Sequence, residues 1–232
     1  MHAGRRPPAL PRLTFLDLST SRVTMADVSS LLRTLPRLRH LVLDHCGLLD
    51  GGADPSDWAV FAEHCLLAGD AQMLEHSLNT QLAEYGGAGP FLREVCVLPR
   101  ALELRTLALS VPADLDADAR RGLLDAFRRG WEKAAVVFNG SVCAARRRRG
   151  EVGVRTLRLP WPGEVCPALR EHGLAGAMAV DDDDEFARLS VTRDGADCPV
   201  LCLAGQYGSE EGIEHAEGCG HSIGWDIWED TL

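Results

Sequence analysis

The sequence predicts an α/β fold: a short solenoid with parallel strands inside, helices outside and an acidic C-terminal capping segment. Three observations lead to this prediction. A short leucine pattern returns at a regular spacing, a helix pattern lies between its first two copies, and acidic residues gather near the C-terminus. One strand–helix repeat cannot bury its leucines alone, so stacked neighbours have to supply the core.

The leucine pattern is L-x-x-L-x-L-x-x-(small or Cys)-x-apolar. Residues 13–23 and 38–48 both follow it, at a distance of 25 residues. Shorter copies begin at Leu104 and Val154, two such periods apart. Each L-x-L core predicts a short strand whose leucines point to one side. The leucines that we expect in one continuous hydrophobic spine are Leu16, Leu18, Leu41, Leu43, Leu107, Leu109, Leu157 and Leu159.

A helix is expected between the first two strands, because parallel strands need a connection that returns the chain. Thr24 is a good N-cap, and Asp27 suits the positive end of a helix. Pro36 then ends the helix. The residues that form its apolar face at helical spacing are Val28, Leu31, Leu32 and Leu35.

Residues 13–48 resemble the leucine-rich repeats of F-box proteins, including the cysteine in the second copy. The later, irregular and arginine-rich repeats are similar to those of fungal F-box and leucine-rich-repeat proteins. The resemblance implies a non-enzymatic adaptor, whose repeats hold a protein substrate while an F-box attaches to a ubiquitin-ligase scaffold. Because a repeat starts by Leu13, we expect no F-box in this chain, so the scaffold is an expected partner only if an F-box lies upstream.

The alternation within each strand also predicts which side chains a protein partner would meet. Residues between the leucines face away from the helices and line the concave side of the sheet. Aromatic, charged and small side chains in register form a suitable recognition surface, and a plain solvated sheet is the alternative. The partner-binding residues that we expect are Phe15, Asp17, His40, Val42, Asp44, Thr106 and Arg158.

The middle of the chain predicts further helices. One begins at Pro55 behind the capping residue Asp54, and a second runs from about residue 70 to 84. Residues 116–149 read as a long helical stretch, in one piece or interrupted at residues 139–140. The segments 187–193 and 199–204 look like short strands, which we expect to form a hairpin or cap over the open end of the stack.

Charge is unevenly distributed along the chain. Residues 1–180 carry 22 basic and 20 acidic side chains, whereas residues 181–232 carry 2 basic and 14 acidic ones. This asymmetry predicts a repeat domain over residues 1–178 and an acidic cap or tail over residues 179–232. Phosphates would be repelled by the acidic end, so nucleic acid is not an expected ligand.

The sequence contains no feature that predicts a membrane or secreted protein. Residues 1–8 have no apolar stretch behind their positive charges, and no run of about 18 apolar residues occurs. Most of the eight cysteines lie in apolar runs, which favours free thiols in a reducing compartment. We therefore expect an intracellular protein, cytoplasmic or nuclear, without a membrane contact.

Residues 220–224 match the nucleophile-elbow motif G-x-S-x-G, but the context argues against catalysis. In that fold an acid and a histidine follow the serine, and no histidine follows Gly224. The preceding residues 210–219 are acidic and glycine-rich rather than strand-like. We expect no catalytic residue and no enzyme. The alternatives are an enzyme with a pocket in the irregular middle section, and a truncated gene product without independent function.

A zinc site is the second possible centre of chemistry. The chain contains the pattern C-x3-C-x12-H-x3-C-x-H over residues 198–221, with thiolate and imidazole ligands. Residues four apart on a strand lie about 13 Å from each other, too far to share one ion. We therefore expect buried thiols and surface histidines, with no metal and no cofactor. The residues kept as a weak metal candidate are Cys198, Cys202, His215 and Cys219.

The C-terminal tail contains two tryptophans within four residues, Trp225 and Trp228, among acidic side chains. Such a segment can anchor back onto the last repeat or bind another chain. Docking within the chain is the interpretation that we favour.

Overall fold

The computed structural model describes eleven stretches of the chain: residues 12–35, 37–48, 54–67, 71–84, 93–98, 102–111, 115–149, 151–158, 178–179, 198–204 and 215–229. The chain divides into two compact units. Unit 1 comprises residues 1–9, 67–101 and 135–191, and unit 2 comprises residues 10–66, 102–134 and 192–232. The expected division at residue 178 stays a prediction, although both ends of the chain contribute elements to unit 2.

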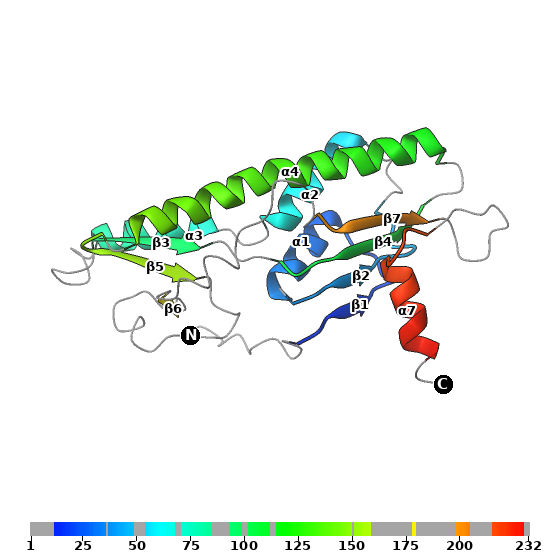
Figure 1. Ribbon diagram of the computed structural model, residues 1–232, viewed down its shortest axis with the longest axis horizontal. Coiled ribbons are helices and arrows are strands. Elements are labelled where there is room, and N and C mark those ends of the chain that lie inside the picture. Colours follow the sequence, from blue (N-terminus) through cyan, green and yellow to red (C-terminus); the bar gives the residue numbers. More distant parts are fainter. Residues whose placement is uncertain are drawn as a thin grey trace. The chain divides into compact units, whose positions relative to one another are not determined.

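Unit 2 contains a four-stranded parallel sheet (Figure 1). Its strands follow one another across the sheet in chain order: β1 (Phe15–Asp17), β2 (His40–Val42), β4 (Thr106–Ser110) and β7 (Val200–Ala204). All three pairings are parallel. The prediction of an α/β fold with parallel strands is confirmed.

In unit 2, the first three copies of the leucine pattern form the expected hydrophobic spine. Leu16 lies opposite Leu41, and Leu41 lies opposite Leu107. Leu201 of β7 continues this row beside Leu107. β7 is thus the fourth strand of the sheet and a parallel neighbour of β4, and the expected hairpin stays a prediction. The segment 187–193, expected as its partner, lies outside the described residues.

Unit 2 also contains helices that follow its strands in sequence. α1 (Met25–Thr34) begins as expected, because the Thr24 side chain accepts a hydrogen bond from Asp27 N while the Asp27 carboxylate accepts one from Thr24 N. α2 (Pro55–Leu66) and the first part of α4 (Ala117–Arg148) pack together through aromatic side chains. The aromatic residues of this contact are Trp58, Phe61, Phe127 and Trp131.

Unit 1 contains a second sheet, in the order β3-β5-β6. β3 (Glu94–Leu98) and β5 (Val154–Arg158) are parallel, and β6 (Met178–Ala179) is antiparallel to β5. The fourth leucine copy is therefore a strand, but it pairs with β3 and not with the first three copies. The prediction that Leu157 belongs to the same spine is wrong, and Leu159 lies outside the described residues.

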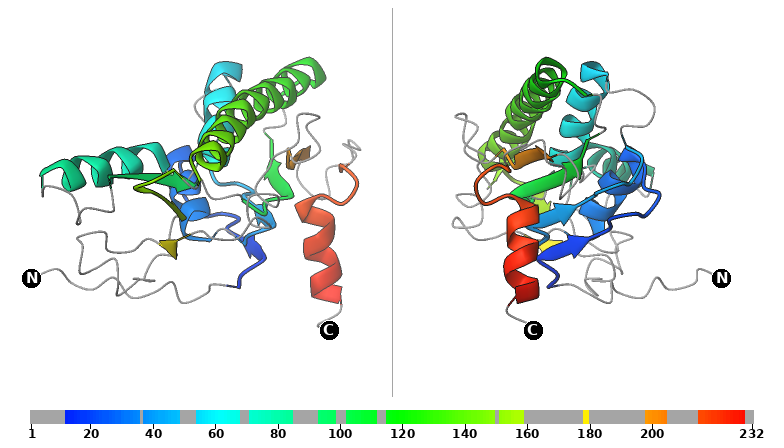
Figure 2. Two further views of the ribbon diagram at one scale, coloured as in Figure 1. Left: turned by 60° about the vertical axis from the view of Figure 1, so that its left-hand side comes forward. Right: turned by 90° about the vertical axis from the view of Figure 1, so that its right-hand side faces the viewer.

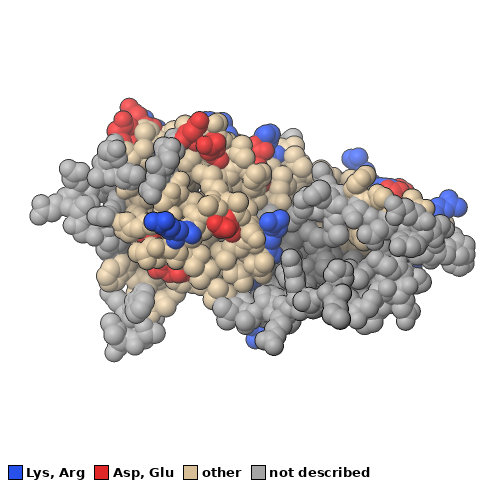
Figure 3. Space-filling model, turned by 180° about the vertical axis from the view of Figure 1, so that it is seen from behind, with Lys and Arg blue, Asp and Glu red and all other residues tan. Residues whose placement is uncertain are grey.

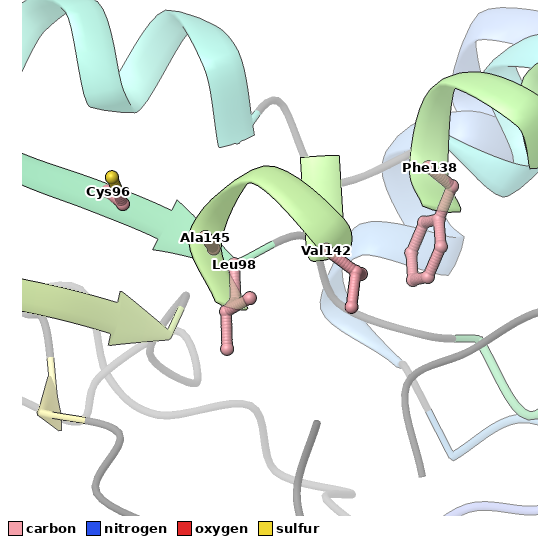
Figure 4. Packing of buried hydrophobic residues seen from close by; sticks show 5 residues of the cluster. All are labelled: Cys96, Leu98, Phe138, Val142 and Ala145. Carbon is pink, nitrogen blue, oxygen red and sulfur yellow. The ribbon is translucent and has the colours of Figure 1, made fainter. Parts of the chain in front are cut away.

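The core of unit 1 forms between β3 and the second part of α4. Phe138, Val142 and Ala145 repeat at helical spacing and meet Cys96 and Leu98 of β3 (Figure 4). α4 runs without a break through residues 139–140, so the interrupted alternative is wrong.

Side chains of helix α3 (Ala71–Glu84) form hydrogen bonds with the backbone of β3 at the edge of the sheet. The Asn79 side chain accepts a hydrogen bond from Val95 N at 2.9 Å and donates one to Val95 O at 3.0 Å. The side-chain amide thus forms the two hydrogen bonds that the backbone of a neighbouring strand would form with Val95. Glu75 accepts from Val97 N at 2.7 Å. These side chains pair polar groups that an open sheet edge would otherwise leave without protein partners.

The C-terminal helix α7 (Gly220–Glu229) belongs to unit 2 and contacts β2 and β4. In the right-hand view of Figure 2 it lies in front of the sheet. No helix in the described part of the chain is long and apolar enough to cross a membrane.

Candidate functional site

The sheet face opposite the leucines carries the residues expected to bind a partner. Two rows cross it in register, Phe15–His40–Thr106 and Asp17–Val42–Ala108–Cys202. The structure therefore brings together most of the predicted surface. Arg158 is the exception, because it lies in β5 of unit 1, opposite Leu98 and Met178.

Helix α7 covers the middle of this face. Val42 and Thr106 are buried, and both lie beside Gly220 at the start of the helix. In this arrangement they cannot meet a partner, which corrects the expectation for these two positions. Phe15 and His40 stay half-buried and Asp17 is exposed, so the accessible part of the predicted surface lies toward β1.

Two glycines allow α7 to lie directly against the sheet. A Cβ atom at Gly220 would lie 3.2 Å from each of three atoms: Ala108 Cβ, Thr106 Oγ1 and Val42 Cγ2. A Cβ at Gly224, one turn further, would lie 3.2 Å from the Phe15 ring. The G-x-S-x-G motif is therefore part of a helix whose glycines form a packing face against the sheet. Trp225 is 48% exposed, and the side chain of Trp228 lies outside the described residues.

Beside these glycines lies a group of four side chains that we call the Cys–His cluster: Cys202, His215, Cys219 and His221. Their ligand atoms all lie within 4.8 Å of one another. His215 Nδ1 lies 3.8 Å from Cys202 Sγ and 3.7 Å from Cys219 Sγ. His221 Nδ1 lies 3.9 Å from Cys219 Sγ. Cys219 is fully buried, whereas His215 is half-buried.

Local structure explains how residues so close in sequence converge. Residues 215–219 form a turn in which Cys219 N donates to Ala216 O at 3.1 Å, and Gly218 has a φ of +65°. Glycine adopts this left-handed conformation without the steric cost of a Cβ atom. The turn places His215 and Cys219 on one side, α7 then presents His221, and Cys202 comes from β7.

Asp44 fixes the orientation of one imidazole. His221 Nε2 lies 2.9 Å from Asp44 Oδ1, so the ring turns Nδ1 toward the cluster. Asp44 was expected to face a partner, and it instead binds the protein's own C-terminal helix. It follows β2, so this contact also joins α7 to the sheet.

The surroundings of the cluster favour positive charge near its thiols. Burial alone would lower the pKa of His221, but hydrogen bonds with Asp44 and Cys202 outweigh it and raise the pKa to about 10. Burial alone would raise the pKa of Cys219, but hydrogen bonds from the Ser222 backbone, Cys202 and His221 hold it below its ordinary value. Each of these hydrogen bonds favours the charged form of the group it contacts, which lowers the pKa of the Cys219 thiol and raises that of the His221 imidazole.

Two kinds of chemistry use such residues. Cys219, His221 and Asp44 stand in the order of nucleophile, base and orienting acid. A nucleophile has to reach its substrate, however, and the Cys219 side chain is 0% exposed. The alternative is metal binding, which uses buried thiolates and also explains why a second thiol and a second imidazole converge there.

Cys198 lies outside the cluster. It precedes β7, and burial raises the pKa of its thiol to about 11. The argument from strand spacing, that Cys198 and Cys202 lie too far apart to share one ion, is therefore consistent with the structure. The error lay in the weak candidate set, which kept Cys198 and left out His221, although the C-x-H spacing of residues 219–221 was the signal for it.

The comparisons with known proteins supply no relative. No family model matches the chain, and neither a curated protein nor a solved structure matches it.

Proposed function

We propose that the chain is a non-enzymatic, protein-binding module of the leucine-rich-repeat type, corresponding to the substrate-holding part of an F-box-like adaptor. The supporting observation is that the same unusual backbone conformation returns after 25 residues, which is the spacing of the leucine pattern. Thr20 and His45 lie 25 residues apart, and both adopt the left-handed conformation, with φ of 66° and 55°. Non-glycine residues rarely adopt it, so its return after one period favours two equivalent turns of a solenoid.

Hydrogen bonds between these turns give further support. The Cys46 thiol donates to Leu18 O at 3.1 Å, and Thr20 N donates to Asp44 O at 2.6 Å. Cys46 is the cysteine of the second leucine copy, so the position singled out by the pattern links one repeat to the next. Stacked repeats are expected to make such nearest-neighbour contacts.

The partner would bind toward β1, where the predicted surface is accessible. Asp17 is exposed, and its Oδ1 accepts from Ser19 N at 2.8 Å and from Ser19 Oγ. His40 Nδ1 lies 3.0 Å from Thr106 Oγ1, which limits rotation of the ring. Side chains held in place before binding lose less conformational entropy on contact.

The distribution of charge fits a protein partner. Figure 3 shows basic and acidic side chains interspersed with uncharged residues over the described part of one face. A polyanion such as nucleic acid favours a continuous basic surface. Mixed charges suit the polar rim of a protein interface.

Site-specific photo-crosslinking tests this proposal. A photoreactive amino acid replaces Asp17 in one version and Asp118 on α4 in another, since the Asp118 side chain is 89% exposed and lies on a helix. In extract of the source organism, we expect a defined protein adduct from position 17 only. Excess unlabelled chain should compete for it, and the additional change Phe15→Ala should weaken it. Equal adducts from both positions, or none from position 17, would contradict the proposal.

A further inference from the structure

We propose that the Cys–His cluster binds one zinc ion, which fastens α7 to the face of the unit 2 sheet. The cluster is the single group of three or more Cys, His, Asp or Glu side chains, among the residues that the structure describes, with a geometry that could hold a metal. The proposal does not depend on the partner-binding role, because it concerns how unit 2 is held together.

The distances agree with tetrahedral coordination. Zinc–sulfur bonds of about 2.3 Å and zinc–nitrogen bonds of about 2.0 Å place sulfur and nitrogen about 3.5 Å apart at the corners of a tetrahedron. Three of the four sulfur–nitrogen distances in the cluster are 3.7, 3.8 and 3.9 Å, and all four ligand atoms lie within 4.8 Å of one another. These three distances would need to shorten by only a few tenths of an ångström to match an ion at the centre of the cluster.

Asp44 supplies the support that a metal-bound histidine requires. Metal-bound imidazoles commonly donate their other N–H to a carboxylate, which fixes the tautomer and the ring orientation. His221 has this arrangement, with Nε2 on Asp44 Oδ1 at 2.9 Å and Nδ1 directed to the cluster. The hydrogen bond therefore directs Nδ1 to the cluster, where it would bind a metal ion after losing its proton.

The donor set selects the kind of ion. Two thiolates and two imidazoles in tetrahedral arrangement suit zinc, whereas magnesium and calcium prefer oxygen ligands. With four protein ligands the coordination is complete, so no position remains for water or a substrate. The ion would be structural rather than catalytic. It would also account for the three other donors that lie around the fully buried Cys219 thiol, because a thiol forms only weak hydrogen bonds.

The site joins two stretches of the chain that are separate in sequence, β7 and residues 215–221. Cys202 lies within β7, His215 and Cys219 flank the turn before α7, and His221 lies in the first turn of the helix. One ion would therefore hold α7 over the sheet face and keep Gly220 against Ala108. Metal binding and helix docking would stabilise each other.

The test uses the full-length chain, purified from cells grown with zinc, and measures bound metal by mass spectrometry. We expect about one zinc ion per chain. Cys219→Ser and Cys202→Ser should each lose it, whereas Cys198→Ser, a matched change four residues from Cys202, should keep it. Asp44→Asn keeps all four ligands and should weaken zinc affinity about 10- to 100-fold.

Cobalt provides a readout that does not depend on whether the variants fold. The wild-type chain refolded with cobalt(II) should show the intense visible bands of a tetrahedral ion and a thiolate-to-cobalt charge-transfer band. Absence of zinc together with a featureless cobalt spectrum would overturn the proposal, as would equal metal loss in Cys198→Ser. If the chain binds no zinc and Cys219 is alkylated rapidly, the interpretation of Cys219 as a catalytic nucleophile would be favoured over metal binding.

Discussion

His221 and Asp44 lie 177 positions apart in sequence, yet His221 Nε2 and Asp44 Oδ1 are only 2.9 Å apart. This contact joins the first turn of α7 to the second residue after β2. It also places the protein's own helix on the surface where the leucine pattern predicted a partner. Whatever binds this face therefore meets α7 as part of it.

Removal of the proposed zinc ion should loosen α7 selectively. After treatment with a chelator, amide hydrogens of residues 220–229 should exchange faster, because the cluster supplies the contacts that hold the helix start. Amides of α1, which contacts α2, provide the internal control and should change little. Hydrogen exchange read by mass spectrometry measures both. Unchanged exchange in α7 would indicate that the helix docks without an ion.

Gly220→Ala should destabilise unit 2, because the added Cβ would meet Ala108, Thr106 and Val42, each at 3.2 Å. Overpacking of this kind costs about 1 to 3 kcal/mol. Gly122→Ala on α4 is the matched control: its Cβ would meet nothing within 4 Å, so helix propensity should make it neutral or stabilising by up to about 1 kcal/mol. Urea unfolding monitored by circular dichroism compares the two. Similar changes in the free energy of unfolding for both variants would mean that Gly220 does not pack against the sheet as described.

Asn79→Ala should destabilise unit 1. It removes both hydrogen bonds to Val95 and leaves a backbone N–H and a carbonyl without their side-chain partner. A loss of about 1 to 3 kcal/mol in the free energy of unfolding is expected. Thr80→Ala is the control, since the exposed Thr80 hydroxyl donates only within its own helix and should change stability by less than about 0.5 kcal/mol. A cost no larger than that of the control would show that α3 does not close the β3 edge.

The ion pair between Glu94 and Arg148 predicts a pH dependence. Arg148 donates to both carboxylate oxygens, one bond measuring 2.6 Å, and the side-chain hydrogen bond holds the pKa of Glu94 below its ordinary value of 4.5. A lowered pKa in the folded state adds stability above the ordinary pKa, and this stability is lost as pH falls through the lowered value.

Glu94→Gln should therefore lower the midpoint of thermal unfolding at neutral pH, and its difference from wild type should shrink as the pH falls below 4.5. Asp125→Asn removes one exposed carboxylate from α4 and serves as the control for net charge. A difference that stays constant from neutral to acidic pH would contradict the assignment of the pair.

Local patterns in the sequence predicted much of unit 2. The capping residues Thr24 and Asp27 marked α1 correctly, and Leu16, Leu41 and Leu107 lie in one row. Both features depend on neighbouring residues, which a sequence displays directly. The sheet to which a strand belongs depends on distant pairing instead. Leu157 repeats the local pattern of Leu107, and it lies in the other sheet.

The true fourth strand carried a signal that a leucine-only pattern misses. By register, Leu107 is opposite Leu201, so Cys198 stands where the third copy has Leu104. Residues 198–203 therefore follow the same pattern with cysteine in the first position. A buried cysteine behaves as a small hydrophobe, which makes the replacement physically reasonable.

The Cys–His cluster could be predicted only in part. Its residue types and most of its spacing were visible, but the turn at Gly218 and the approach of α7 to β7 are tertiary features. The role of Asp44 was also hidden, because strand alternation shows which way a side chain points and not what lies over it.

The most direct test of this account is X-ray absorption at the zinc edge of the purified full-length chain. We predict a first coordination shell of two sulfur atoms at about 2.3 Å and two nitrogen atoms at about 2.0 Å. A shell of nitrogen and oxygen only, or one with a single sulfur, would contradict a zinc ion held by Cys202 and Cys219 and the fastening of α7 that follows from it.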